Sequence, residues 1–308
     1  MKKKIELKPH HGVALFAFQI LVFVFVCAPL QYNLGMAGLA ATQVILLLLA
    51  VIPAVLSGNS LREIFPVKRA TMRNIFGVLL FWLGGVVLNM IIMLVTAYLF
   101  PDELLQSNRG VSDFFMSVHV IAGFAIVAVM PGICEEALHR GFIQYSMRGL
   151  NKWTLVFVMG LIFGIFHLDP LRFLPTAMLG AILSYMMLET KNIIIPAAFH
   201  MFNNAVSFTV TALSSELSGE AEATAVSGAE FSAALGAYLI LGAIVPWLFL
   251  WGGKLLHTKE YNLERKAEQK KAAVVAAVIS PLMLIAGGVA VVWGGLALVE
   301  QGGLRFLG

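Results

Sequence analysis

The feature that most constrains this chain is a succession of long apolar runs separated by short charged stretches. Of its 308 residues, 59% are hydrophobic and 12% are charged, whereas soluble domains have roughly 45–50% apolar and about 25% charged residues. A helix of about 20 apolar residues crosses a bilayer, and backbone groups in lipid must bond within the segment. The sequence therefore predicts an all-α fold, a polytopic transmembrane helical bundle.

Nine apolar runs are expected to form helices, which gives eight or nine membrane spans. We expect residues 1–308 to form a single integral membrane domain that carries a buried site on its central helices. The expected helices are 13–30, 36–56, 75–100, 114–149, 153–168, 171–189, 192–212, 231–251 and 272–298.

The distribution of positive charge predicts the orientation of the chain. Most of its 21 Lys and Arg residues fall in alternate loops, and such loops face the cytoplasm. We therefore expect a cytoplasmic amino terminus in a bacterial or archaeal cytoplasmic membrane, with membrane lipid as a partner. The net charge of +4 follows from these flanking residues, so a nucleic-acid partner is not expected.

Four titratable residues inside the fourth run are the first sign of a functional site. Glu135, Glu136, His139 and Arg140 lie within six positions of an apolar segment, where each charged group costs about 2.5–3.5 kcal/mol. They must be paired, neutral or hydrated. Because residues four apart share a helix face, we expect pairs between Glu136 and Arg140 and between Glu135 and His139.

The same segment contains Pro131 and Gly132, which predict a kink that makes room for water. Depth along the membrane then relates this helix to the next one. Glu135 and His167 both lie 14 residues from the turn that joins them, so both stand roughly 21 Å above that turn. His200 and Asn204 share one face of a third helix. The sequence predicts that these groups converge on one buried point.

Three short motifs on successive helices carry a resemblance to a known family. They are Glu135-Glu136-x-x-x-Arg140, Phe163-x-x-x-His167 and His200-x-x-x-Asn204, in this order. Together they resemble the CPBP family, which contains the CAAX proteases and the bacteriocin-processing or immunity proteins. The resemblance covers residues 115–212, the expected catalytic core of the membrane domain.

The resemblance implies an intramembrane endopeptidase that hydrolyses a peptide bond of a membrane-associated or prenylated (CAAX-type) protein or peptide. By this resemblance Glu135 and His167 would position and deprotonate the attacking water. The His and Asn of the third motif would stabilise the oxyanion. Arg140 would keep Glu136 ionised. A buried carboxylate and neutral donors suit these tasks.

A metal-dependent variant of this chemistry stays open at this stage. Glu135, His167 and His200 could hold Zn²⁺ with water as a fourth ligand. The compact His-Glu-x-x-His arrangement is missing, and the family has been described both as metalloproteases and as metal-free glutamate proteases. We favour the glutamate-type mechanism without a cofactor.

Two other classes of protein also fit buried Glu, His and Arg residues. A proton-coupled transporter uses such residues as a relay, although no internal repeat supports one here. A catalytically silent bacteriocin-immunity or scaffold membrane protein would carry the same motifs. The sequence does not distinguish a prenylated substrate from an unmodified one.

Overall fold

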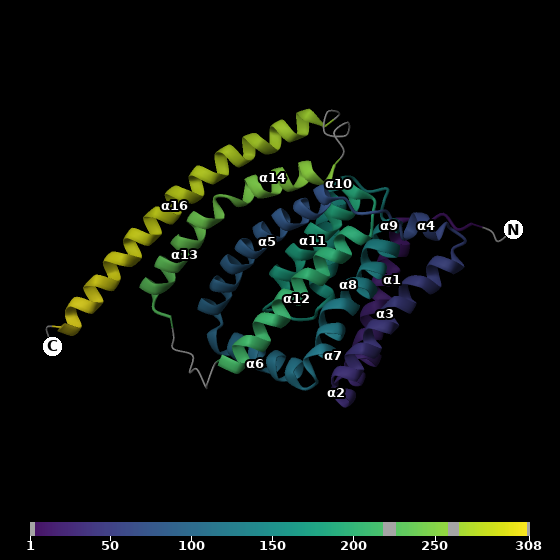
Figure 1. The fold of residues 1–308 in the computed structure, drawn as a ribbon, viewed down its shortest axis with the longest axis horizontal. Coiled ribbons are helices and arrows are strands. Elements are labelled where there is room, and N and C mark those ends of the chain that lie inside the picture. The colour runs from purple at the N-terminus through teal and green to yellow at the C-terminus, as the bar shows by residue number, and fades with distance from the viewer. Residues whose placement is uncertain (1–3, 218–225, 258–264, 307–308) are drawn as a thin grey trace. The chain divides into compact units, whose positions relative to one another are not determined.

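A computed structural model describes residues 4–217, 226–257 and 265–306, and in these ranges the chain is helical, with no strand. Figure 1 labels the α-helices, and three further segments of the described chain are π-helical and are named η. In order, the helical segments are α1 (Pro9–Val22), η1 (Phe23–Cys27), α2 (Ala28–Leu34), α3 (Met36–Leu56), α4 (Leu61–Ile64), α5 (Met72–Leu99), α6 (Pro101–Met116), α7 (Val120–Phe124), η2 (Ala125–Val129), α8 (Met130–Glu136), η3 (Ala137–Ile143), α9 (Gln144–Ser146), α10 (Lys152–Phe166), α11 (Phe173–Thr190), α12 (Ile194–Leu217), α13 (Gly228–Gly242), α14 (Val245–Leu256) and α16 (Lys266–Phe306).

The predicted polytopic helical bundle is confirmed, because all nine apolar runs lie mostly within helices, although the run 231–251 is divided between α13 and α14. Among the described residues, seven helical segments are long and apolar enough to cross a membrane: Pro9–Leu34, Met36–Leu56, Met72–Leu99, Val120–Ser146, Phe173–Thr190, Gly228–Leu256 and Lys266–Glu300. The predicted count of eight or nine spans includes two helices outside this set. They are α10, which has only 15 residues, and α12, which contains polar residues in its middle.

The start of the fourth predicted helix was wrong. The run from residue 114 combines the end of α6 with a separate helix that begins at Val120. His119 caps that second helix, since its ring nitrogen Nδ1 accepts from the backbone N–H of Ile121 at 3.4 Å. The search for apolar runs did not identify α6 as a separate helix. Its apolar side chains are mixed with polar ones along an amphipathic helix, so they do not form a continuous apolar run.

The helices form two compact units, and one of the boundaries between them falls inside α6. The first unit contains α1–α4 and α7–α12, and the second contains α5, α13, α14 and α16. Every residue predicted for the site lies in the first unit. That residues 1–308 act as one membrane domain stays a prediction.

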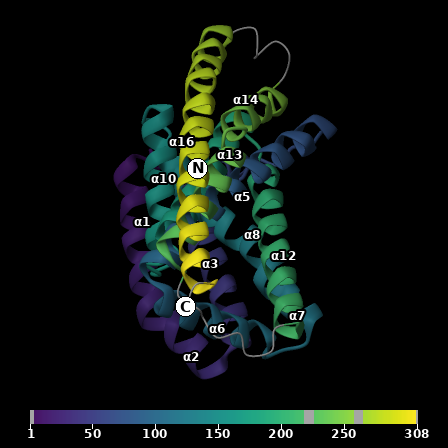
Figure 2. The same ribbon diagram turned by 90° about the vertical axis from the view of Figure 1, so that its left-hand side faces the viewer.

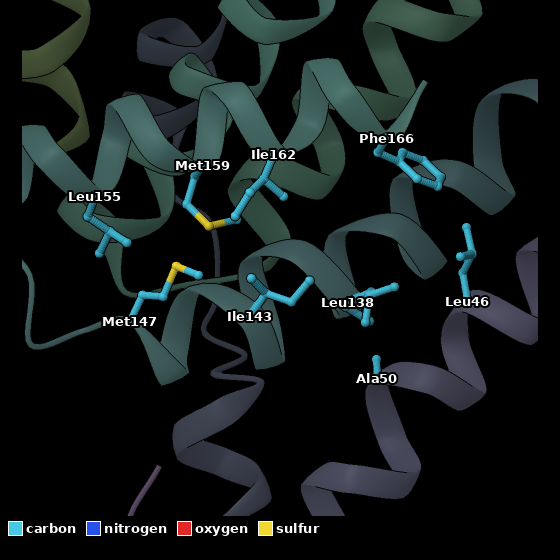
Figure 3. Close-up of a cluster of buried hydrophobic side chains, with 10 residues drawn as sticks. Leu46, Ala50, Leu138, Ile143, Met147, Leu155, Met159, Ile162 and Phe166 are labelled. Carbon is cyan, nitrogen blue, oxygen red and sulfur yellow. The ribbon is translucent and has the colours of Figure 1, made fainter. Parts of the chain in front are cut away.

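In the first unit a cluster of apolar side chains joins α3, η3 and α10 (Figure 3). Its buried members are Leu46, Ala50, Ala137, Leu138, Ile143, Met147, Leu155, Met159, Ile162 and Phe166. Helices in lipid associate through close packing rather than exclusion of water. This cluster therefore holds the two helices that carry Glu135 and His167 against each other.

The second unit uses glycine for the same purpose. In it α16 lies along α13 (Figure 2), and a Cβ added at Gly236 of α13 would lie only 2.6 Å from the carbonyl oxygen of Gly287. Small residues allow such close backbone approach between membrane helices. None of the residues predicted for the site takes part in this contact between α13 and α16.

Candidate active site

The two adjacent carboxylates of the first motif lie at the end of α8, between two π-helical segments. The helix continues through Glu135 and Glu136 to Ser146, as the depth argument predicted. The irregularity expected at Pro131 and Gly132 takes the form of η2 before α8 and η3 after it. Single π-helical turns inside an α-helix are frequent at functional sites.

Pro131 has a specific consequence for Asn204. A proline lacks the N–H that would donate to the carbonyl of the residue four positions earlier, which is Val127. The carbonyl oxygen of Val127 instead accepts from the side-chain amide of Asn204 on α12, at 3.2 Å. A backbone group released inside the membrane is thus satisfied by a neighbouring helix. One of the two amide hydrogens of Asn204 is committed to this bond.

Glu136 lies at the centre of a buried charged network that faces α12. Its Oε1 atom accepts from Nη1 of Arg140 at 3.3 Å and lies 2.9 Å from Nδ1 of His200. Its Oε2 atom is 3.3 Å from Nε of Arg140. Glu136 and Arg140 are fully buried. The predicted pairing of these two residues is confirmed, and the pair also binds an imidazole.

Close approach of α8 and α12 makes the contact between Glu136 and His200 possible. A Cβ added at Gly132 would meet the side chain of Met201 and lie 3.0 Å from the carbonyl oxygen of Ala197. Glycine at this position therefore lets the two backbones approach. The remaining donor of Arg140, Nη2, binds the carbonyl oxygen of Gly180 on α11 at 3.0 Å.

Glu135 faces the opposite neighbour, α3. Its Oε1 atom accepts from Nε2 of Gln43 at 3.0 Å, and both side chains are buried. The expected pair with His139 takes a different form, because Nδ1 of His139 binds the backbone carbonyl of Glu135 at 2.9 Å. Nε2 of His139 lies 3.1 Å from the amide nitrogen of Gln19 on α1. The carboxylate of Glu135 therefore binds Gln43 and not His139.

His167 ends α10 and is partly buried. Its Nδ1 atom lies 2.8 Å from the carbonyl oxygen of Phe163, and its ring is within electrostatic range of Glu135. The next residue, Leu168, has a φ of 50°, a left-handed conformation that non-glycine residues seldom adopt. Asp169 stabilises this turn by accepting from the backbone N–H groups of Leu171 and Arg172.

Three histidines and Arg140 all contact the ring of Phe163. The ring centroids of His139, His167 and His200 lie 5.2, 4.8 and 5.6 Å from that of Phe163. Cζ of Arg140 lies 4.5 Å from it, over the ring. A cation above an aromatic face is favourable. Phe163, the first residue of the second motif, therefore packs against side chains of all three motifs.

Hydrogen bonding fixes which nitrogen of each imidazole is the base. Each of His139, His167 and His200 has Nδ1 next to a carbonyl or carboxylate oxygen. An oxygen of that kind only accepts, so Nδ1 carries the hydrogen and the lone pair of the neutral ring is on Nε2. In His139 this lone pair accepts from Gln19. Nε2 of His167 is therefore suited to accept a proton.

Two site residues were missed by the sequence argument, Gln19 and Gln43. Each is buried and contacts a titratable residue of α8 or η3. A detectable signal existed, because each is a polar residue inside an otherwise apolar membrane helix, and such residues are functional candidates. The prediction started from ionisable groups and from the three motifs, and neither glutamine belongs to them.

The predicted zinc ligands do not form a metal-binding group in this arrangement. Across the part of the chain that the structure describes, no three His, Cys, Asp or Glu side chains are grouped so as to hold a metal ion. Nδ1 of His200 is bound to Glu136, and Oε1 of Glu135 is bound to Gln43. We therefore derive no catalytic step through Zn²⁺.

The fold and the site together define a class, an integral membrane protein with a buried carboxylate–imidazole centre. Residues 117–206 match a family model described as Rce1-like, type II CAAX prenyl endopeptidase Rce1-like. This segment is therefore similar to the CAAX-protease type of intramembrane endopeptidase, and the resemblance predicted from the three motifs is confirmed. Neither a curated protein nor a solved structure matches the chain.

Proposed function

We propose that this protein is an endopeptidase that hydrolyses a peptide bond by means of a water molecule activated by Glu135 and His167. The observation that carries the proposal is the buried carboxylate of Glu135. It lies in the segment that matches the CAAX-protease family model, and its Oε2 atom has no hydrogen bond within the described structure. A general base needs such a free acceptor within reach of the reacting water.

The reaction begins when the water gives a proton to Oε2 of Glu135 and its oxygen attacks the carbonyl carbon of the scissile bond. The tetrahedral intermediate then breaks its C–N bond, and the leaving nitrogen takes up the proton. Nε2 of His167 carries a lone pair and takes up the second proton of the former water when the acid product ionises, and then passes that proton to the amine. The products are a carboxylate and an ammonium group, so atoms and charge balance without a further reactant.

The oxyanion of the intermediate requires donors, which we assign to His200 and Asn204. His200 can donate from Nε2 only as an imidazolium, since its neutral ring has the hydrogen on Nδ1. Glu136 lies 2.9 Å from Nδ1 and accepts the hydrogen there. Asn204 has one amide hydrogen left after its bond to Val127. Removing one donor of this kind typically reduces kcat about 10²–10³-fold.

The substrate that we propose is a membrane-associated protein or peptide with a prenylated CAAX-type terminus. The support is the description of the matched family model, which names CAAX prenyl endopeptidases. A prenyl chain would hold the substrate in the same lipid phase as the buried carboxylate. An unmodified membrane peptide is the alternative that the experiment distinguishes.

The test compares purified wild-type protein with Glu135→Gln on a farnesylated CAAX peptide that carries a fluorophore and a quencher on either side of the expected cleavage site. Gln preserves the size of the side chain and its acceptor for Gln43. We expect kcat to fall about 10²–10⁴-fold, because the base is lost. The matched control is Glu63→Gln, which changes an exposed carboxylate bonded to Tyr145 and should leave cleavage unchanged.

Two further arms separate the alternatives. The unprenylated peptide should be cleaved more slowly if the lipid group is recognised. A chelator should leave the rate unchanged, and complete loss restored by zinc alone would overturn the glutamate-type mechanism. Equal cleavage by the wild type and Glu135→Gln would contradict the enzymatic proposal itself. It would favour the alternative of a catalytically silent scaffold protein.

A further inference from the structure

Gln43 is the only neutral side chain described as bonded to the carboxylate of Glu135, and it is supplied by α3, outside the segment that matches the family model. Its side chain is 3% exposed. The residue lies one turn before Leu46, which belongs to the apolar cluster that packs α3 against η3 and α10. Gln43 is therefore held against the site by packing as well as by its hydrogen bond.

The orientation of the Gln43 amide follows from chemistry. An ionised carboxylate accepts hydrogen bonds and does not donate them, so the amide nitrogen must face Oε1 of Glu135. The amide oxygen consequently points away from that bond. Both this Oε1 atom of Gln43 and Oε2 of Glu135 are buried without a hydrogen bond within the described structure. Buried polar atoms are rarely left in this state.

We propose that these two oxygens together bind the nucleophilic water, so that Gln43 is a water-positioning residue. The two oxygens belong to groups joined by one hydrogen bond, and both require a donor. Water is the small molecule with two O–H donors to offer, one to each acceptor. This inference rests on the proposed function, which it extends by a residue from outside the three motifs.

The arrangement would direct the reaction. With both hydrogens engaged, the lone pairs of the water oxygen face away from Glu135 and Gln43, toward a bound substrate. The hydrogen that the water donates to Oε2 of Glu135 is the proton that transfers to this carboxylate as the water oxygen attacks the carbonyl carbon. The second hydrogen stays on the attacking oxygen, bonded to Gln43. Correct placement of this kind contributes to catalysis because the reacting atoms need not be reoriented.

The first test uses Gln43→Met, an unbranched side chain of similar length that removes both the donor and the acceptor. We expect kcat for the farnesylated peptide to fall about tenfold or more while KM is unchanged, since a hydrogen bond to a charged group is lost at the base and not at the substrate. The matched control is Gln31→Met, which removes a 3.0 Å bond from a glutamine to Thr42, the neighbour of Gln43 on α3.

A second readout does not depend on activity. Dicyclohexylcarbodiimide modifies carboxyl groups in apolar surroundings, and in the wild type the hydrogen bond from Gln43 occupies Oε1 of Glu135. Labelling of the peptide that contains Glu135 should therefore be about tenfold faster in Gln43→Met than in wild type. If Gln43→Met does not fold, Gln43→Leu is the replacement. Labelling and kcat both equal to wild type would overturn the role of Gln43.

The water itself is tested by a crystal structure of the wild type at a resolution that shows ordered solvent. We expect one water within hydrogen-bond distance of both oxygens, and its absence from well-defined density would overturn the proposal. The outcomes also separate from those of the proposed function. An inactive Glu135→Gln together with a fully active Gln43→Met would reject only the water-positioning role, whereas an active Glu135→Gln would reject the function.

Discussion

The two sides of α8 show how adjacent carboxylates acquire different tasks. On the side facing α12, Glu136 binds a guanidinium and an imidazole, so both of its oxygens are near a cation or a possible cation. On the side facing α3, Glu135 binds a neutral amide and keeps one oxygen without a hydrogen bond in the described structure. Consecutive helical residues point about 100° apart, which is what separates their surroundings.

This difference matches the requirements of structure and of catalysis. A buried ion pair is held together because removal of one partner leaves an uncompensated charge. A general base, in contrast, must have an acceptor that is free to take a proton. The carboxylate of Glu136, on the α12 side, is therefore expected to govern stability, and the carboxylate of Glu135, on the α3 side, is expected to take the proton in the chemical step. Three variants on the α12 side test this division, in order of expected effect.

The largest effect is expected from Arg140→Met. The substitution leaves Glu136 buried without its cation, and breaking a buried pair destabilises by about 3–5 kcal/mol. Thermal unfolding in detergent should show a large drop in Tm. The control is Arg148→Met, whose exposed guanidinium lies 4.1 Å from the ring centroid of Tyr145 and contributes little.

A double variant sharpens this prediction. Adding Glu136→Gln to Arg140→Met removes the stranded charge and should recover part of the lost stability. Equal Tm for Arg140→Met and the wild type would contradict the assignment of Glu136 and Arg140 to stability.

An intermediate effect is expected from Asn204→Leu, which leaves the carbonyl of Val127 without its donor. An unsatisfied buried acceptor costs about 1–3 kcal/mol, and activity should fall as well if Asn204 also binds the oxyanion. The second substitution Pro131→Ala separates the two roles, because alanine supplies an N–H four residues after Val127. We expect the double variant to regain stability, measured by thermal unfolding, but not activity.

Unchanged stability in Asn204→Leu would show that another group satisfies Val127. Activity that recovers together with stability in the double variant would confine Asn204 to a structural task. The cycle of single and double variants measures the coupling directly.

The sequence was sufficient for the helices because apolar run length is a local property. It predicted the helix through Glu135 and Glu136, and it predicted the pair between Glu136 and Arg140, since both follow from spacing along one helix. The amphipathic helix α6 escaped because its apolar residues are not contiguous. Motifs on three helices gave the resemblance that the family model later matched.

Contacts between helices were only partly predictable. Spacing on α8 could not decide that His200 meets Glu136 and that Gln43 meets Glu135, because these contacts depend on how α12 and α3 pack. The bond from Asn204 to Val127 was accessible in principle, since Pro131 announces a carbonyl without a donor. Its partner, however, lies on a different helix, which spacing alone does not identify.

The smallest effect, about 1 kcal/mol, is expected from Gly132→Ala, which adds one methyl group to a close contact. The new Cβ would overlap Cγ of Met201 and would lie 3.0 Å from the carbonyl oxygen of Ala197, so the side chain of Met201 must move and α8 and α12 must separate. The contact between Glu136 and His200 should loosen and kcat should fall, while carbodiimide labelling of Glu135 stays at the wild-type rate because its contact with α3 is intact. Gly288→Ala is the control, since no atom lies within 4 Å of its added Cβ. Faster labelling of Glu135 in Gly132→Ala would show that the two sides of α8 are coupled, and the division between them would then have to be abandoned.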